Sequence, residues 1–152
     1  MSVTINSIAA GGDAGQLVNV ECSISKGLPG IVIVGFANKA VDEAKERVRS
    51  AFSNTKLELP RKRITINLAP ADLPKESPGF DMAIATAILG ANKQIDVAKT
   101  QNTIFIGELG LNGDIRPIRG IIGALIAASQ QGWLKFYIPS QNLKQAKLIP
   151  NP

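Results

Sequence analysis

The sequence predicts an α/β domain of the α+β type, in which an N-terminal β-hairpin joins a mixed sheet and helices pack on that sheet. Two early segments alternate apolar and polar residues, at positions 3–7 and 17–24, as half-buried strands do. From residue 38 onward, helical spacing alternates with short apolar runs. Strands that come first and are followed by alternating helices and strands are typical of helices packed on a mixed sheet.

The first third of the chain supplies the hairpin and a further strand. The stretch GGDAG (11–15) separates the two alternating segments as a turn, and a second turn is expected at 27–30. The run IVIVG at 31–35 is wholly apolar up to its glycine. Such a run is typical of a central strand covered on both faces, so we expect it in the middle of the sheet.

The clearest helix follows, with Asn38 as its expected N-cap and Asn54 as its stop. Its apolar residues recur every three or four positions: Ala40, Val41, Ala44, Val48, Ala51 and Phe52. The opposite face carries charges that we expect to be solvated: Glu43, Lys45, Glu46, Arg47 and Arg49. A strand at 64–68 comes next.

The rest of the chain alternates helices and strands. A helix at 82–89, beginning at Gly79 or Asp81 with Asp81 as its cap, is apolar nearly all round and should be buried. A strand is expected at 103–109, with Asn112-Gly113 as a hairpin turn. The remaining expected elements are a helix at 121–132 closed by Gly132, a strand at 133–139, and a short helix at 141–147 capped by Ser140.

Composition excludes several classes of site. The chain has 152 residues, no histidine and one cysteine, Cys22. An internal disulfide, a multi-cysteine metal site and a Ser-His or Cys-His nucleophile are therefore excluded. The sequence contains neither GxxxxGK[ST] nor GxGxxG, so we expect no nucleotide cofactor and no metal in this chain. The net charge of +5 mildly favours a polyanionic partner.

Two loops rich in glycine, proline and charge are candidate sites, at 67–81 and 107–120. Each lies between a predicted strand and a predicted buried helix, where binding residues often gather. The alternative interpretation is that both are rigid connectors, stiffened by Pro74 and Pro78. The basic residues in and near these loops are candidate nucleic-acid contacts if the loops share one sheet edge; otherwise they are ordinary solvated charges. They are Arg61, Lys62, Arg63, Lys75, Arg116 and Arg119.

Several strings, in order, resemble the ComM/YifB family of Mg-chelatase-like bacterial ATPases. They are VGFANKAVDEAKERVRSAF, PADLPKESPGFDMAIATAIL, GELGLNGDIRPIRG and IPSQNLKQA. The chain departs from the family pattern at Phe36, Ala37 and Gln145. The resemblance covers nearly the whole chain and implies a domain at 1–149 that precedes an AAA+ module, with 150–152 as the start of a linker.

The same loops resemble, more distantly, the proteolytic domain of Lon proteases and a C-terminal domain of RadA-type recombination proteins. The resemblance implies a Lon-protease-like fold. Aligning the motifs places Gly79 at the position of the nucleophilic serine and Ile122 at that of the lysine. Neither residue can do that chemistry, so no catalytic residue is expected. A displaced pair, Ser77 with Lys75, is the enzymatic alternative.

The resemblance therefore implies a non-catalytic N-terminal domain of an AAA+ ATPase or helicase of the ComM type, which acts in natural transformation and DNA recombination. Such a domain would contribute to ring assembly or DNA contact. ATP and Mg would be used by the full-length protein, a hexamer, with DNA and the AAA+ module as partners. A pure protein-interaction module is a further alternative. Without a signal peptide or an apolar run long enough to span a bilayer, we expect a cytoplasmic protein with no membrane partner.

Overall fold

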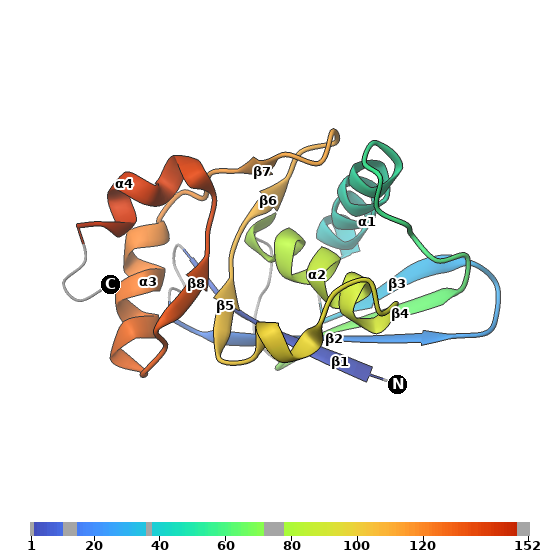
Figure 1. Cartoon of the computed structure of the whole chain (residues 1–152), viewed down its shortest axis with the longest axis horizontal. Coiled ribbons are helices and arrows are strands. Elements are labelled where there is room, and N and C mark those ends of the chain that lie inside the picture. The colour runs from blue at the N-terminus through green and yellow to red at the C-terminus, as the bar shows by residue number, and fades with distance from the viewer. Residues whose placement is uncertain (1, 11–14, 36–37, 72–77, 149–152) are drawn as a thin grey trace.

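A computed structural model describes residues 2–10, 15–35, 38–71 and 78–148. Their strands form a six-stranded sheet in the order β3-β4-β2-β1-β5-β8 and a small sheet of β6 and β7 (Figure 1). The strands are β1 Ser2–Ile8, β2 Leu17–Ser25, β3 Gly30–Val34, β4 Arg63–Ala69, β5 Thr103–Phe105, β6 Glu108–Leu109, β7 Ile115–Arg116 and β8 Lys135–Tyr137. The helices are α1 Asn38–Ser53, α2 Asp81–Ala91, α3 Ile121–Gln130 and α4 Leu143–Ala146, with 3-10 turns at Pro78–Phe80, Val97–Thr100 and Ser140–Asn142.

The main sheet is mixed, as predicted. β1 and β2 form the antiparallel hairpin, and β2 also pairs antiparallel with β4. β3 runs parallel to β4, while β5 runs parallel to both β1 and β8. The predicted fold class and its N-terminal hairpin are therefore confirmed.

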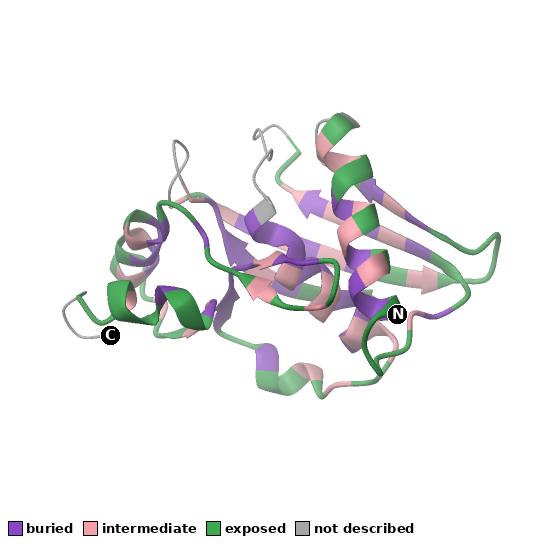
Figure 2. Cartoon of the chain, turned by 90° about the horizontal axis from the view of Figure 1, so that it is seen from above, coloured by how far each residue is buried: buried purple, intermediate pink, exposed green. Residues whose placement is uncertain are grey.

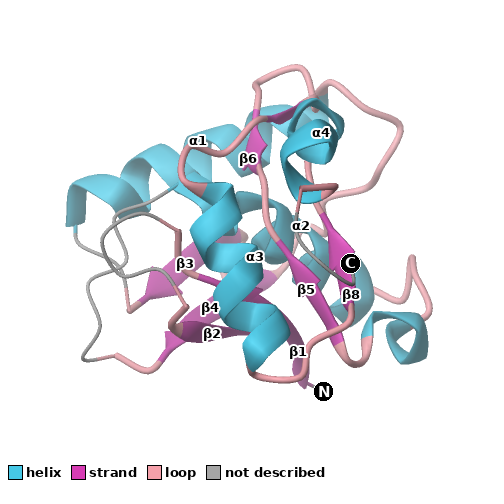
Figure 3. Ribbon diagram, turned by 90° about the vertical axis from the view of Figure 1, so that its left-hand side faces the viewer, coloured by secondary structure: helices cyan, strands magenta, loops and turns pink. Residues whose placement is uncertain are grey.

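Helices cover both faces of the sheet. Phe105 of β5 packs in a hydrophobic cluster with α1, α2 and β1–β4, whereas its neighbours Ile104 and Ile106 pack in a second cluster with α3. Because successive side chains of a strand point to opposite faces, α2 and α3 lie on opposite sides of β5. Figure 3 shows α3 on one side of the strands, and Figure 2 shows the buried residues gathered along the sheet and the inner helix faces.

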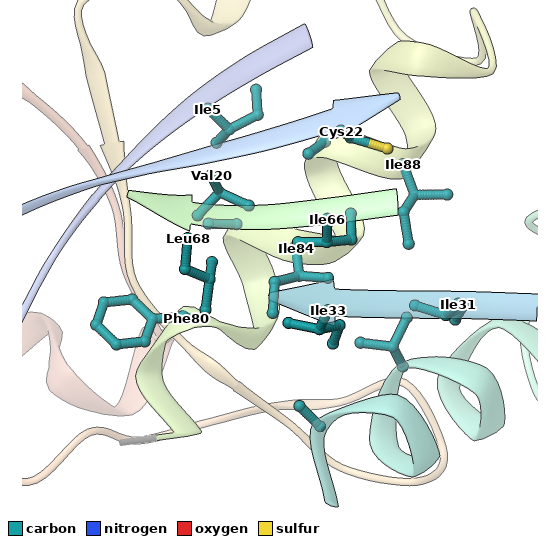
Figure 4. Close-up of a cluster of buried hydrophobic side chains, with 14 of the residues drawn as sticks. Ile5, Val20, Cys22, Ile31, Ile33, Ile66, Leu68, Phe80, Ile84 and Ile88 are labelled. Atoms are coloured by element: carbon teal, nitrogen blue, oxygen red, sulfur yellow. The ribbon is translucent and has the colours of Figure 1, made fainter. Parts of the chain in front are cut away.

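The larger cluster is the centre of the molecule. Figure 4 shows Val20, Ile66 and Leu68 of the sheet meeting Ile84 and Ile88 of α2. All five side chains are fully buried. The apolar character of α2 on nearly every side is thus explained by burial, as predicted.

The prediction that 31–35 is a central strand is wrong, because β3 lies at the edge of the sheet and pairs with β4 alone. Ile31 and Ile33 are buried, but Val34 is 46% exposed. Only one face of β3 is covered, so its apolar run reflects β-branched residues at an edge and not burial on both sides.

The predicted strand at 103–109 is two strands in two sheets. β5 ends at Phe105, and the Ile106 N–H still bonds to the Tyr137 carbonyl at 3.0 Å. Gly107 then turns away, bonding through its N–H to Gly79 and through its carbonyl to the Met82 N–H, both at 3.0 Å. An added Cβ at Gly107 would lie 2.7 Å from Ile115 Cγ2 and 3.3 Å from Met82 Cβ, so a larger residue here would force these side chains to shift.

Two predicted caps are also corrected. Phe80 occupies the N-cap position of α2, and the Asp81 side chain makes no capping bond. Ser140 begins a 3-10 turn whose N-cap is Pro139. Gly132 does close α3 as predicted. It has φ +99°, and the Trp133 N–H bonds to the Ala128 carbonyl at 3.1 Å.

Candidate functional site

The two loops singled out in the sequence meet in the structure. Backbone hydrogen bonds join Gly107 to Gly79 and to Met82, so the start of one loop lies against the end of the other. Residues 72–77 of the first loop, which include Lys75 and Ser77, lie outside the described residues. The junction is therefore built from residues 78–82 on one side and 107–120 on the other.

A buried ion pair lies at this junction. The Arg47 guanidinium donates to both carboxylate oxygens of Asp81, with Nε–Oδ2 at 2.5 Å and Nη2–Oδ1 at 3.0 Å. The Leu109 N–H donates to the same Oδ2 at 3.1 Å. Asp81 is fully buried and the Arg47 side chain is 18% exposed. One carboxylate thus connects α1, α2 and β6, three elements whose positions Figure 1 labels.

Burial and hydrogen bonding act in opposite directions on this pair. Burial raises the pKa of the Asp81 carboxyl above its ordinary value, while the hydrogen bonds and charge of Arg47 and the Leu109 N–H oppose the rise. Burial by itself lowers the pKa of Arg47, but its hydrogen bonds and attraction to Asp81 outweigh that effect, so the pKa is raised. Both carboxylate oxygens are buried and accept hydrogen bonds from Arg47 or the Leu109 N–H, so we interpret the pair as a structural contact between elements.

The β6–β7 hairpin rests on the end of α1. Its Asn112-Gly113 turn was predicted, and Gly113 has φ +94°. The Asn54 side-chain amide donates to the Leu111 carbonyl at 2.9 Å. A Cβ at Gly113 would stand 2.6 Å from Thr55 Cγ2, so glycine is required for this close approach.

Two depressions flank the hairpin. An apolar one of about 180 Å³ lies between α1, α2 and the hairpin, with Phe52, Met82 and Leu109 in its wall. An open polar one of about 580 Å³ lies on the hairpin's other side and is lined by Glu108, Asp114, Arg116 and Gln141 among others. Neither holds a nucleophile beside a base. The described residues also contain no group of three or more His, Cys, Asp or Glu side chains that could bind a metal.

A buried amide fixes the far end of the second loop. The Asn142 side chain accepts from the Ile118 N–H at 2.8 Å and donates to the Ile118 carbonyl at 3.3 Å. Asn142 is 3% exposed, and its amide also donates to Gln145 at 2.7 Å. Asn142 lies in the IPSQNLKQA string. Its side-chain amide makes the two hydrogen bonds with the Ile118 backbone that a neighbouring strand could otherwise make.

Comparison with known proteins places this arrangement in a family. A family model described as subunit ChlI of Mg-chelatase matches residues 20–142, which is most of the chain. The chain belongs to this ChlI family.

Two relatives sharpen the assignment. Competence protein ComM of Haemophilus influenzae is 43% identical over 145 residues, which is 95% of this chain and 28% of that protein. Protein YifB of Escherichia coli, described as uncharacterized, is 44% identical over 132 residues, 87% of this chain and 26% of that protein. The chain therefore spans about a quarter of the length of these ComM- and YifB-like relatives.

A more distant relative supports the fold. Lon protease of Geobacter metallireducens is 29% identical over 146 residues, covering 90% of this chain and 17% of that protein. At the two positions that were aligned above with the serine and lysine of Lon motifs, the Gly79 carbonyl accepts a hydrogen bond from the Gly107 N–H, and Ile122 of α3 packs against the second hydrophobic cluster. The Ser77–Lys75 alternative lies outside the described residues.

The predicted basic residues do not all share one edge. Arg61, Lys62 and Arg63 lie at the amino end of β4, whereas the 67–81 loop leaves its carboxyl end. β4 has seven residues, so about 20 Å separate its two ends. Arg116 lies in β7 beside Gly110, and Arg119 lies two residues before α3. Lys75 is not described.

Sequence reasoning missed the Arg47–Asp81 pair. Arg47 was expected on the solvated face of α1, yet it is half-buried next to the core position Val48. The available signal was its place at the border of the apolar stripe, four residues before Ala51. Nothing in the local pattern names Asp81, which lies 34 residues away in the chain, as its partner.

None of the helices that the described residues form has the length and apolar character needed to cross a bilayer.

Proposed function

We propose that this chain is the non-catalytic N-terminal domain of a ComM-type AAA+ ATPase, which contributes to ring assembly or DNA contact in natural transformation and DNA recombination. The observation that supports this most is the similarity to ComM, which covers 95% of this chain but only 28% of that protein. The match therefore concerns one part of a longer relative. ATP hydrolysis is assigned to a module outside these 152 residues.

Features of the sequence and of the described residues support a proposal in which this chain does not bind the nucleotide. The sequence has no GxxxxGK[ST] loop to cradle phosphates, and the described residues offer no cluster of ligands for a metal ion. The polar depression beside the hairpin mixes Glu108 and Asp114 with Arg116, which is unfavourable for a triphosphate. In this proposal ATP and Mg are used by the full-length protein, which we propose to be a hexamer.

Calorimetry tests whether this chain binds ATP by itself. Titration of ATP with Mg into the 1–152 chain should show no binding. A dissociation constant in the micromolar range would contradict a non-catalytic role.

In the host organism, deletion of the gene should lower the frequency of transformation by chromosomal DNA, and an unchanged frequency would contradict the role in transformation.

The similarity to Lon proteases keeps one alternative open for test, a peptidase using Ser77 and Lys75. Cleavage of a fluorogenic peptide or of casein by this chain, lost in Ser77→Ala, would establish it. We expect no cleavage, because the aligned Lon positions carry Gly79 and Ile122, which cannot act as nucleophile and base.

A further inference from the structure

The turn between β2 and β3 encloses the start of β4. Arg63 pairs with Ser25 of β2 on one side and with Gly30 of β3 on the other. The Gly30 N–H bonds to the Lys62 carbonyl at 3.2 Å, and a Cβ at Gly27 would lie 3.5 Å from Arg63 Cβ. The turn and the start of β4 are therefore one surface, named here the basic tip, made of residues 25–30 and 61–63.

The positive charges of the basic tip form no ion pair with any residue that the structure describes. Its four basic residues, Lys26, Arg61, Lys62 and Arg63, are all exposed. Among the described residues, ion pairs join Arg47 to Glu43 and Asp81, and Arg49 to Glu46; none involves the basic tip. The acidic Glu21, further along β2, is engaged by the Asn67 amide at 2.8 Å. The four cations are thus available to an external anion.

An exposed leucine stands among these cations. Leu28 is 86% exposed, the highest value among the large hydrophobic side chains that the structure describes, and Pro29 follows it. The tip lies at the right-hand end of Figure 1, opposite α3 and α4, and Figure 2 shows this turn as exposed. Leu28 contributes nothing to either hydrophobic cluster, so the fold gives no reason for an apolar side chain there.

We propose that the basic tip binds DNA, with its four cations on backbone phosphates and Leu28 as a wedge at an unstacked base step. This inference deepens the DNA-contact branch of the proposed function and rests on it. Clustered Lys and Arg neutralise phosphates and release counterions, which supplies sequence-independent affinity. Leucine and proline are among the side chains that proteins insert between base steps. The four cations therefore favour a polyanion as the partner. The exposed Leu28 favours a nucleic acid whose bases can be unstacked.

The first test measures affinity for a forked DNA with single-stranded arms by fluorescence anisotropy, between 50 and 200 mM salt. Four phosphate contacts on single strands predict a slope of log affinity against log salt of about −2.8. The variant R61A/K62A/R63A should reduce the slope magnitude by about 2 and weaken binding at least about 10-fold at low salt. The matched control K135A/K144A/K147A removes three exposed lysines at the opposite end and should bind like the parent.

The second test isolates the wedge. A 2-aminopurine at the fork junction should brighten when the parent chain binds, because unstacking relieves its quenching. L28S should lose most of that increase while keeping the salt slope. The matched control L134S removes another leucine, 76% exposed and beside Lys135, and should brighten like the parent. Because all of these side chains are exposed, melting temperatures should be unchanged.

The outcomes separate this inference from the proposed function. If the lysine control weakens binding as much as the basic-tip variant, DNA is bound elsewhere and the inference is wrong, while a DNA-contacting domain stands. If the parent does not bind DNA at 50 mM salt, the inference is wrong and ring assembly becomes the surviving branch. Binding to vesicles of anionic lipid that depends on Leu28, without DNA binding, would also overturn it. If L28S raises the 2-aminopurine fluorescence as much as the parent does, Leu28 does not act as a wedge and that part of the inference is wrong.

Discussion

The two hydrophobic clusters differ in how the chain builds them. The larger one lies between the helices α1 and α2 and the strands β1–β4. These four strands have five to nine residues each and pair in continuous ladders. The smaller one packs α3 against β5 and β8, strands of three residues each. Their polar ties differ as well. A charged pair, Arg47–Asp81, borders the first, and a neutral amide, Asn142, borders the second. Its longer ladders should therefore make the first region the more stable, and its buried charge should make it the more sensitive to removal of one charged partner.

Removal of the charge partner should cost most. Arg47→Met leaves the Asp81 carboxylate buried beside a single backbone donor, and loss of one partner of a buried pair costs about 3–5 kcal/mol. Urea unfolding followed by circular dichroism measures this loss. The double variant R47M/D81L removes both charges and should recover part of the stability. If R47M costs no more than about 0.5 kcal/mol, the pair is not the tie described.

Matched core truncations should separate the two clusters. Leu68→Ala in the first cluster and Leu125→Ala in the second each delete a leucine that is at most 3% exposed. Both should fall within about 2–5 kcal/mol, with Leu68→Ala the larger. Native-state hydrogen exchange should show amides of α3 opening at lower free energy than those of β2 and β4. Equal opening energies would mean that the clusters unfold as one unit.

The neutral tie should matter less than the charged one. Asn142→Ala leaves the buried Ile118 N–H and carbonyl without their side-chain partner, which costs about 1–3 kcal/mol. Exchange of the Ile118 amide should accelerate in step with this loss. Gln141→Ala, an exposed neighbour, is the control and should be neutral.

Two glycines allow the cost of a turn to be divided into strain and clash. Gly132 has φ +99° and open space where a Cβ would stand, so Gly132→Ala should cost about 1–2 kcal/mol from conformation alone. Gly113 has φ +94°, and a Cβ there would also meet Thr55 at 2.6 Å, so Gly113→Ala should cost more. Thermal melts of both variants provide the comparison. The double variant G113A/T55S, which removes the Cγ2 methyl, should lower the cost toward that of G132A.

The smallest effect concerns Cys22, which is 1% exposed in the larger cluster. Burial raises the pKa of its thiol to about 12, so at pH 8 it is neutral and enclosed. Native protein should not react with a disulfide reagent such as Ellman's, whereas protein unfolded in urea should react completely. Fast reaction of the native protein would show that the first region opens readily.

Patterns that depend on neighbours in the chain were predictable. The alternation of β1 and β2, the burial of α2, the Asn112-Gly113 turn and the closure of α3 by Gly132 each follow from local residue chemistry. The errors arise where tertiary structure decides. IVIVG lies at an edge because β4 inserts between β2 and β3. The run 103–109 breaks because Gly107 must bond to Gly79. The Asp81 carboxylate accepts hydrogen bonds from Arg47 of α1 and does not cap α2, the helix that it begins.

The candidate site was predictable only in outline. The sequence singled out both loops, and the structure joins them at Gly79 and Gly107. It also singled out Arg61, Lys62 and Arg63, but grouped them with loop residues from which the length of β4 separates them. Their neighbours in the structure, Lys26 and Leu28, lie in the turn between β2 and β3, which the sequence analysis predicted only as a turn without a functional role. Whether these residues bind DNA stays a prediction.

The amide of Asn142 has a mechanical consequence. It ties the segment before α4 to Ile118, just beyond β7; β7 is laddered to β6; and Leu109 of β6 is held by Asp81, which grips Arg47 of α1. These contacts act in series, like links of a chain running over the outside of the six-stranded sheet. These contacts therefore connect the segment before α4 to α1 by a route that does not run through the strands of the six-stranded sheet.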